Sequence, residues 1–119
     1  MANGALFHVV IETRSNADWV VAFEYLAADV PVDLTGSTLA LMVRKRREDH
    51  EAIVAVDTAD GNIVITNPAL GKFQVKLPQI SLERMAAGEY LHDLIRTRPD
   101  GLLEAMWEGE LIHEIGVTR

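Results

Sequence analysis

Lys72-Phe73-Gln74-Val75-Lys76-Leu77 alternates polar and apolar side chains along its whole length. This period of two places Phe73, Val75 and Leu77 on one face of a β-strand and leaves the other face to water. Thr38 to Arg44 repeats the pattern, with leucine or valine at every second position. A strand with one apolar face must pack that face against another layer, so these two segments predict a fold of packed sheets.

Other segments of the same kind predict a total of about seven to nine short strands. They are Phe7–Ile11, Trp19–Leu26, Ala52–Val56, Asn62–Ile65, Tyr90–Thr97, Leu102–Glu108 and Leu111–Ile115. One short helical turn is expected near residues 81–87, with Ser81 as its N-cap and Gly88 as its end. Without amphipathic helices to serve as crossovers, the sheets are expected to be mainly antiparallel. Residues 1–119 are therefore predicted to form a single all-β domain, an antiparallel β-sandwich.

The segment Arg98-Pro99-Asp100-Gly101 carries the clearest turn signal. Proline, aspartate and glycine in this order fit a type I turn followed by a left-handed residue, a common hairpin connection. A two-residue loop would shift the parity and exchange the faces, so both registers stay open. Counting outward from the longer loop gives the expected pairs Arg96 with Glu104, Leu94 with Met106 and His92 with Glu108.

Both faces of this hairpin are apolar. In the register above, one face carries Leu94 and Met106, and the other carries Leu91, Ile95, Leu103, Ala105 and Trp107. A single core cannot easily cover both faces, and monomers seldom expose large apolar patches. Leu91, Ile95 and Trp107 are therefore the predicted protein interface.

The composition argues against several classes of protein. The chain has 119 residues, with 11 Lys and Arg against 18 Asp and Glu, for a net charge of −7. An acidic chain does not favour nucleic acid as a partner, because that binding relies on cationic side chains displacing counterions. The chain has no cysteine, which excludes disulfides, Cys-ligated metals and a thiol nucleophile. No apolar run approaches the roughly 20 residues that span a bilayer, so no membrane segment is predicted. The first residues lack a secretory pattern, and cytosolic synthesis is expected.

No residue pattern points to catalysis or to a bound cofactor. The histidines His8, His50, His92 and His113 lack the short spacings of metal sites, so a metal would need ligands that converge in space. His92 opposite Glu108 could be an acid–base pair, but a surface cross-strand pair is favoured. Ser15, Ser37 and Ser81 occupy turns or a cap rather than a nucleophile elbow. The basic run Arg44-Lys45-Arg46-Arg47 is read as a solvated strand end, because acidic residues follow it. Trp19 and Trp107 could stack on sugars, although such residues are more often core or interface.

The order of motifs resembles the immunoglobulin-like β-sandwich of tailed-phage and prophage virion proteins, including the N-terminal domain of baseplate upper proteins. The best single match is Asp33-Leu34-Thr35-Gly36 before a strand. The chain has His92 where the family often has a second aromatic residue after Tyr90. The matching segments are Trp19–Tyr25, Asp29-Val30-Pro31-Val32, Ser37–Arg44, Gly71–Leu77, Ser81–Ala87, Gly88-Glu89-Tyr90, Asp93, Asp100-Gly101, Glu108-Gly109 and Gly116-Val117-Thr118-Arg119.

This resemblance implies assembly rather than catalysis. The chain would be a non-enzymatic structural or adaptor subunit of a phage or prophage tail or baseplate. It would need no cofactor, would be synthesised in the bacterial cytoplasm as a virion component, and would bind other virion proteins or form a homo-oligomer. The alternative is a carbohydrate-binding or adhesin-like module with an aromatic face, and a small hydrolase comes third.

Overall fold

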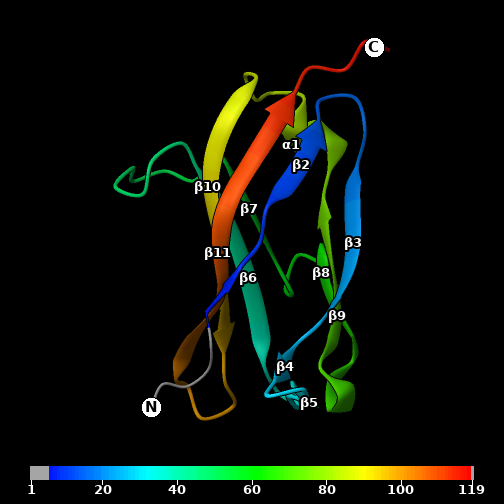
Figure 1. Cartoon of the computed structure of the whole chain (residues 1–119), viewed down its shortest axis with the longest axis vertical. Coiled ribbons are helices and arrows are strands. Elements are labelled where there is room, and N and C mark those ends of the chain that lie inside the picture. Colours follow the sequence, from blue (N-terminus) through cyan, green and yellow to red (C-terminus); the bar gives the residue numbers. More distant parts are fainter. Residues whose placement is uncertain (1–5, 119) are drawn as a thin grey trace.

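The computed structural model describes residues 6–118, which form two β-sheets that face each other (Figure 1). The larger sheet consists of β1 (Phe7–His8), β2 (Ile11–Arg14), β6 (Thr38–Arg44), β7 (Val54–Asp57), β10 (Gly88–Thr97) and β11 (Leu103–Glu114). The smaller sheet consists of β3 (Trp19–Glu24), β8 (Ile63–Asn67) and β9 (Lys72–Leu77). The remaining elements are a ribbon of β4 (Leu26–Ala27) and β5 (Val30–Pro31), the 3₁₀ turn η1 (Pro68–Leu70) and the helix α1 (Gln79–Leu82).

The strand order is that of an immunoglobulin variable-type sandwich. The larger sheet runs β1-β11-β10-β6-β7, with β2 also on β11, and the smaller sheet runs β3-β9-β8. In immunoglobulin terms these are the sheets G-F-C-C′ and B-E-D. The predicted immunoglobulin-like, mainly antiparallel sandwich is confirmed. Among the described strands, only β1 and β2 pair in parallel, both with β11. Parallel strands need a long connection, and here it consists of all the strands between β2 and β11.

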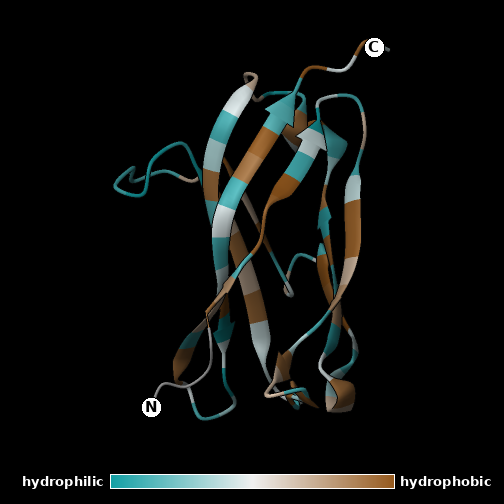
Figure 2. Ribbon diagram, viewed as in Figure 1, coloured by the Kyte–Doolittle hydropathy of each residue, from teal (hydrophilic) through white to brown (hydrophobic). Residues whose placement is uncertain are grey.

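The core lies between the sheets and follows the alternation in the sequence (Figure 2). Leu39, Leu41 and Val43 of β6 are buried, as are Phe73 and Val75 of β9. The outward neighbours of these residues are exposed or half-buried. The strand bounds predicted at 38–44 and 72–77 agree with the structure.

Two turns differ in how well they were predicted. The Asp33 turn forms as expected, because the Thr35 amide donates to Asp33 Oδ1 at 2.9 Å and Gly36 has a φ of +76°. The helical turn lies earlier than expected: α1 begins after Pro78, whose φ of −65° and extended ψ suit the N-cap position. Ser81 is thus inside the helix rather than its cap.

A tyrosine fastens the start of β10. The Tyr90 hydroxyl donates to the Ala86 carbonyl at 2.6 Å, and the side chain is buried. This is the tyrosine corner of immunoglobulin-like domains, in which the residue two positions later is often a cysteine. That position is His92 here. The segment Gly88-Glu89-Tyr90 could have indicated this corner from the sequence.

A β-bulge changes the predicted register of the hairpin. Near the turn the prediction is correct, since Arg96 pairs with Glu104. Between Leu94 and Ile95 the register shifts, and Leu94 then faces Trp107 rather than Met106. The extra residue reverses the faces of β11 beyond it. Trp107 therefore points into the core, where it is 4% exposed, and its predicted place beside Leu91 and Ile95 is wrong.

Candidate functional site

The outward side of the larger sheet carries several apolar side chains, with the charged Asp93 opposite Met42. Cross-strand pairing places Ile95 between Ala40 of β6 and Ala105 of β11, and it places Met42 beside Ala55 of β7. Small alanine side chains keep this area flat. We call this surface the outer face and define it by Thr38, Ala40, Met42, Ile53, Ala55, Leu91, Asp93, Ile95, Thr97, Leu103 and Ala105.

Three large apolar side chains of the outer face are exposed. Leu103 is 72% exposed, Ile53 is 44% exposed and Met42 is 40% exposed. Leu91 and Ile95, two of the predicted interface residues, are half-buried on the same face. Their role as an interface stays a prediction, but the structure does bring both of them to a solvent-facing sheet.

Charged side chains border the outer face along β11 and the loop after β6. The guanidinium of Arg47 lies 3.0 Å from the Glu108 carboxylate, and His8 Nε2 lies 3.0 Å from Glu110. Arg44 donates to the backbone carbonyl of Asp49 at 3.0 Å. The basic run is thus largely engaged with acidic residues and backbone carbonyls. An apolar centre with a charged border is the usual anatomy of a protein–protein interface.

Trp107 sits at the centre of an aromatic cluster between the sheets. Its ring centroid is 4.6 Å from that of Phe23 and 6.0 Å from that of Phe73. Its indole N–H donates to His92 Nδ1 at 3.2 Å. Trp107 therefore has no free ring face for a sugar. Trp19 is half-buried and packs at 6.2 Å from Phe23.

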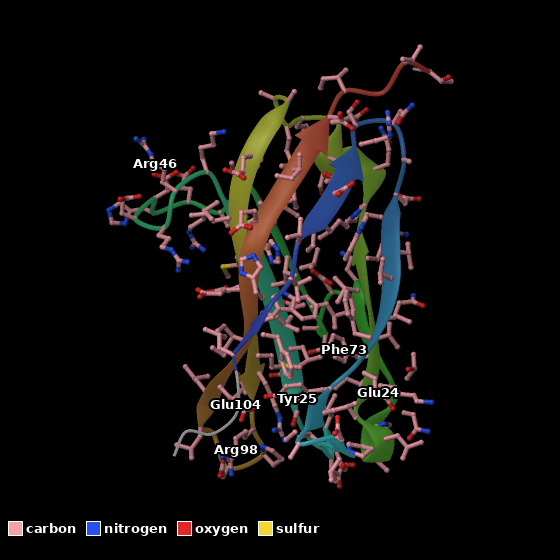
Figure 3. All side chains as sticks on the ribbon, in the orientation of Figure 1. Glu24, Tyr25, Arg46, Phe73, Arg98 and Glu104 are labelled. Atoms are coloured by element: carbon pink, nitrogen blue, oxygen red, sulfur yellow. The ribbon has the colours of Figure 1, made fainter. Side chains whose placement is uncertain are left out.

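A cleft of about 270 Å³ opens beside this cluster, between β1 and β3. Phe7 and Tyr25 meet edge to face at 6.2 Å across it, and Phe73 lies at its floor. Figure 3 shows Tyr25 and Glu104 in the lower part of the sandwich. Burial raises the pKa of the Tyr25 hydroxyl, and the nearby Glu104 carboxylate raises it further. The cleft is apolar, with its polar groups at the edge.

The four described histidines do not gather at one place with other metal-binding side chains. No group of three His, Asp or Glu side chains within residues 6–118 lies close enough to hold a metal ion. His92 pairs with Gly109 and is 4% exposed, so the surface cross-strand pair predicted with Glu108 is wrong, and the alternative acid–base pair does not form either. Its side chain turns inward, where burial lowers its pKa. His113 is also buried, at 1% exposed.

Two of the three serines have structural partners, as predicted. Ser15 Oγ accepts from the Gly116 amide at 2.9 Å, and Ser37 Oγ accepts from Arg96 Nε at 2.9 Å. Neither hydroxyl bonds to a histidine in the part of the chain that the structure describes. These contacts favour roles in turns rather than in nucleophilic catalysis.

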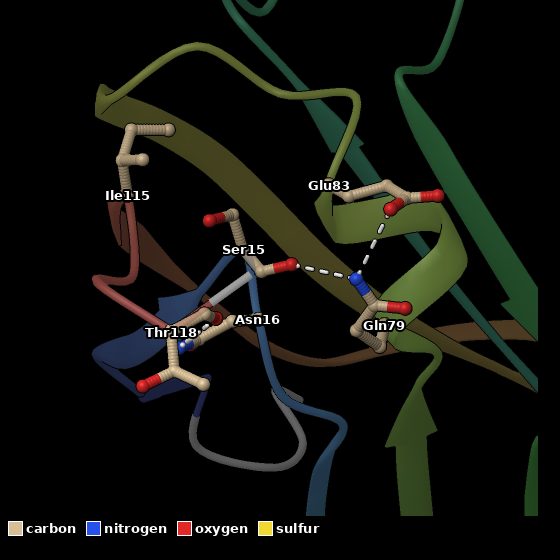
Figure 4. Close-up of a pocket in the computed structure, with 6 residues that line it drawn as sticks. All are labelled: Ser15, Asn16, Gln79, Glu83, Ile115 and Thr118. Atoms are coloured by element: carbon tan, nitrogen blue, oxygen red, sulfur yellow. Dashed lines mark hydrogen bonds between the residues drawn. The ribbon is translucent and has the colours of Figure 1, made fainter.

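A polar recess at the end of the sandwich that holds α1 is closed by its own hydrogen bonds (Figure 4). Gln79 Nε2 donates to the Ser15 carbonyl at 2.9 Å and to Glu83 at 3.2 Å. Asn16 donates to the Thr118 carbonyl at 2.9 Å. These bonds join α1, the β2–β3 turn and the last described residues, so the recess is primarily a structural junction.

Comparisons with known proteins reach the level of the fold. No protein-family model and no curated protein matches the chain. Among solved structures the chain is similar to murine CRIg, with 13% sequence identity and a TM-score of 0.44, over 90% of this chain and 92% of that chain. No helix among the described residues is long and apolar enough to cross a membrane. The assignment of the immunoglobulin-like fold rests on the strand order and pairing given above.

Proposed function

We propose that this chain is a non-enzymatic assembly module that binds proteins through the outer face. The observation that carries the proposal is the flat apolar centre at Ala40, Met42 and Ile95, bordered by charged side chains. Burying such a centre removes apolar surface from water, and the charged border can select the partner. Sheet faces of this kind serve assembly without any reactive group.

We further propose that the module is a structural or adaptor subunit of a phage or prophage tail or baseplate. Support for this setting comes from the order of sequence motifs, above all the Asp33-Leu34-Thr35-Gly36 turn before β6. Its partner would be another virion protein or a second copy of the chain. Tail or capsid genes beside the gene for this chain would support the setting, and genes of an unrelated pathway would contradict it.

The sugar-binding alternative loses one of its two tryptophans, and the other, Trp19, is half-buried. Trp107 was the aromatic side chain on the predicted outer surface of the hairpin, and its burial at 4% exposed removes it from that role. Among the aromatic side chains that line the cleft, Phe7 is exposed, at 43%.

Charge inserted into the outer face tests the proposal. Ala105→Glu places a carboxylate at an exposed position beside Ile95, where burial against a partner protein should weaken association by more than about tenfold. Val64→Glu is the matched control, because Val64 is 45% exposed but lies on β8 of the other sheet. Sedimentation of both variants over a range of concentrations, alone and with candidate tail proteins, gives the comparison. Equal association by both variants, or a wild-type chain that binds neither itself nor a tail protein, would contradict the proposal.

A further inference from the structure

β1 and β2 pair in parallel with β11, one after the other. We call residues 7–14, which contain both strands, the N-terminal segment. Phe7 pairs with Trp107 and Ile11 pairs with Leu111. The segment covers β11 from Trp107 to Glu114 at the edge of the larger sheet. We call this strip of β11 the slot.

The slot is shaped for this segment. A Cβ atom on Gly109 would overlap the carbonyl of Val9, so the absence of a side chain there makes room for the backbone that crosses it. Ile11 is 1% exposed and Thr13 is 4% exposed, so alternate residues point inward. A strand that fills the slot therefore needs a large apolar residue followed, two positions later, by a hydroxyl.

Two buried histidines attach the segment to the sheet. His92 Nε2 lies 3.0 Å from the Val9 carbonyl oxygen, and His113 Nδ1 lies 2.8 Å from Thr13 Oγ1. The two imidazoles come from neighbouring strands, β10 and β11. Each contacts a different part of the N-terminal segment.

The contact between His92 and Trp107 requires a neutral imidazole, whereas the Nε2–H donation to Val9 persists on an imidazolium, so a proton acts on the segment by placing a buried charge beside it. The indole N–H of Trp107 can only donate, so His92 Nδ1 must accept and Nε2–H must donate to Val9. A proton on Nδ1 would set two N–H groups against each other. Protonation would therefore break the contact between His92 and Trp107.

The surroundings of His92 only partly favour a charge. Burial lowers its pKa, whereas the Val9 carbonyl and the Asp93 and Glu110 carboxylates act in the opposite direction. Arg44 and Arg47 line a recess on the outward side of the sheet at His92. Neither arginine would stabilise an imidazolium.

The His113 side chain is almost completely buried. Burial lowers its pKa, and the backbone groups of Leu82 and Met85 offset part of this effect. Its Nε2 makes no hydrogen bond to any of residues 6–118. A proton there would be buried without a carboxylate partner.

We propose that the slot is a strand-exchange site: acid loosens the N-terminal segment, and on neutralisation the same segment of a second copy takes its place. The occupant follows from the pattern above, because a second copy carries the Val9, Ile11 and Thr13 that the slot fits. Exchange of an identical element keeps every contact of the closed chain, so it is an inexpensive route to a dimer. This edge lies apart from the outer face, and the inference does not rest on the proposed function.

Only the N-terminal segment is expected to open, because the turn that follows it stays bonded to α1. The Gln79 side chain bonds the Ser15 carbonyl, and the Gln79 amide bonds Asp18 Oδ1 at 2.7 Å. Figure 4 shows Gln79 reaching Ser15. None of these bonds involves a histidine. The segment is therefore expected to swing out just before Ser15.

Cross-linking tests the exchange directly, since the natural chain has no cysteine. Glu12 and Ile112 are paired across β2 and β11, so Glu12→Cys and Ile112→Cys are introduced into separate chains. The two chains are mixed, held at about pH 5.5, returned to neutral pH and oxidised. For each coupled proton, opening should increase by up to about tenfold per pH unit, and the disulfide heterodimer should increase accordingly over an unpulsed mixture. In the control, Val64→Cys replaces Ile112→Cys and reports random collisions.

Hydrogen exchange of the wild-type chain provides a second measurement that no variant can disturb. Between about pH 6.5 and 5.5, the protection of residues 7–14, corrected for intrinsic rates, should fall by up to about tenfold for each coupled histidine proton, while β6 keeps its protection. His92→Gln keeps a donor and an acceptor without titrating, and should reduce this fall, whereas the exposed His50→Gln should not. The proposal would be overturned by an equal loss of protection in β6, by no loss of protection in residues 7–14, or by no more disulfide heterodimer than the Val64→Cys control gives.

Discussion

Arg96 is the most strongly engaged charged side chain in the interior, and its removal gives a sharp test of the structure. It points inward from β10 and is 8% exposed. Its guanidinium donates to Ser37 Oγ at 2.9 Å, to the Asp33 carbonyl at 3.0 Å and to Glu104 Oε1 at 3.1 Å. One side chain thus joins β10, β11 and the turn before β6.

Arg96→Met keeps most of the aliphatic volume and removes the charge. It leaves the Glu104 carboxylate, with 24% of its side chain exposed, without its cationic partner. Breaking a buried ion pair from one side costs about 3–5 kcal/mol, and partial hydration of Glu104 places the expected loss at the lower end, about 3 kcal/mol. Arg98→Met is the matched control: its pair with Asp100 is 43% and 49% exposed, and such surface pairs contribute about 0–1 kcal/mol.

Urea unfolding at neutral pH measures both variants, and the titration of Tyr25 adds a local measurement. The charge of Arg96 lowers the pKa of Tyr25, so its removal should raise that pKa further. Adding Glu104→Leu to Arg96→Met should restore part of the stability, because no unpaired charge then remains. If Arg96→Met destabilises no more than Arg98→Met, the buried network does not exist as described.

Three further predictions concern the glycines, the core tryptophan and the histidines. Gly71→Ala should destabilise by at least about 1 kcal/mol more than Gly61→Ala in thermal unfolding; both glycines have positive φ, but only a Cβ at Gly71 would meet backbone oxygens. Trp107→Ala should destabilise the chain by about 3–5 kcal/mol, and a variant that stays stable but loses assembly would contradict its place in the core. Burial lowers the pKa of His92 and His113 in the folded chain. The free energy of unfolding should therefore be at its full value above about pH 6.5 and fall below it, by up to about 2.7 kcal/mol per pH unit for the two protons. Urea unfolding at several pH values measures this dependence, and a free energy that does not change with pH would refute it.

Local alternation was enough to predict the strands that carry one buried face. The segments 38–44 and 72–77 need no distant information, because leucine, valine or phenylalanine at every second position already selects the buried side. The Asp33 turn is similarly local, since a carboxylate bonds an amide two residues on.

Features that depend on distant segments could not be predicted in this way. Leu102–Glu108 and Leu111–Ile115 read as two strands because glycine is rare inside a strand, yet β11 runs through Gly109. The reason is the crossing of Val9, about a hundred residues earlier in the chain, over that glycine. The bulge beside Leu94 has no local sequence signal either, and it is the reason that Trp107 lies in the core rather than on the predicted outer face.

The aromatic cluster explains how this immunoglobulin-like chain holds its sheets together without a cysteine. In antibody domains, a disulfide joins the sheets at the position two residues after the corner tyrosine. Here that position is His92, and Trp107 packs against it while its ring also meets Phe23 of β3 and Phe73 of β9 in the opposite sheet. The connection between the sheets is therefore made by aromatic packing, and the hydrogen bond to His92 fixes the Trp107 ring within the larger sheet. A reductant has no disulfide to break here, whereas acid would remove that hydrogen bond and place a charge beside Val9. The pH of the surroundings, rather than their redox state, should therefore control how firmly the N-terminal segment is held.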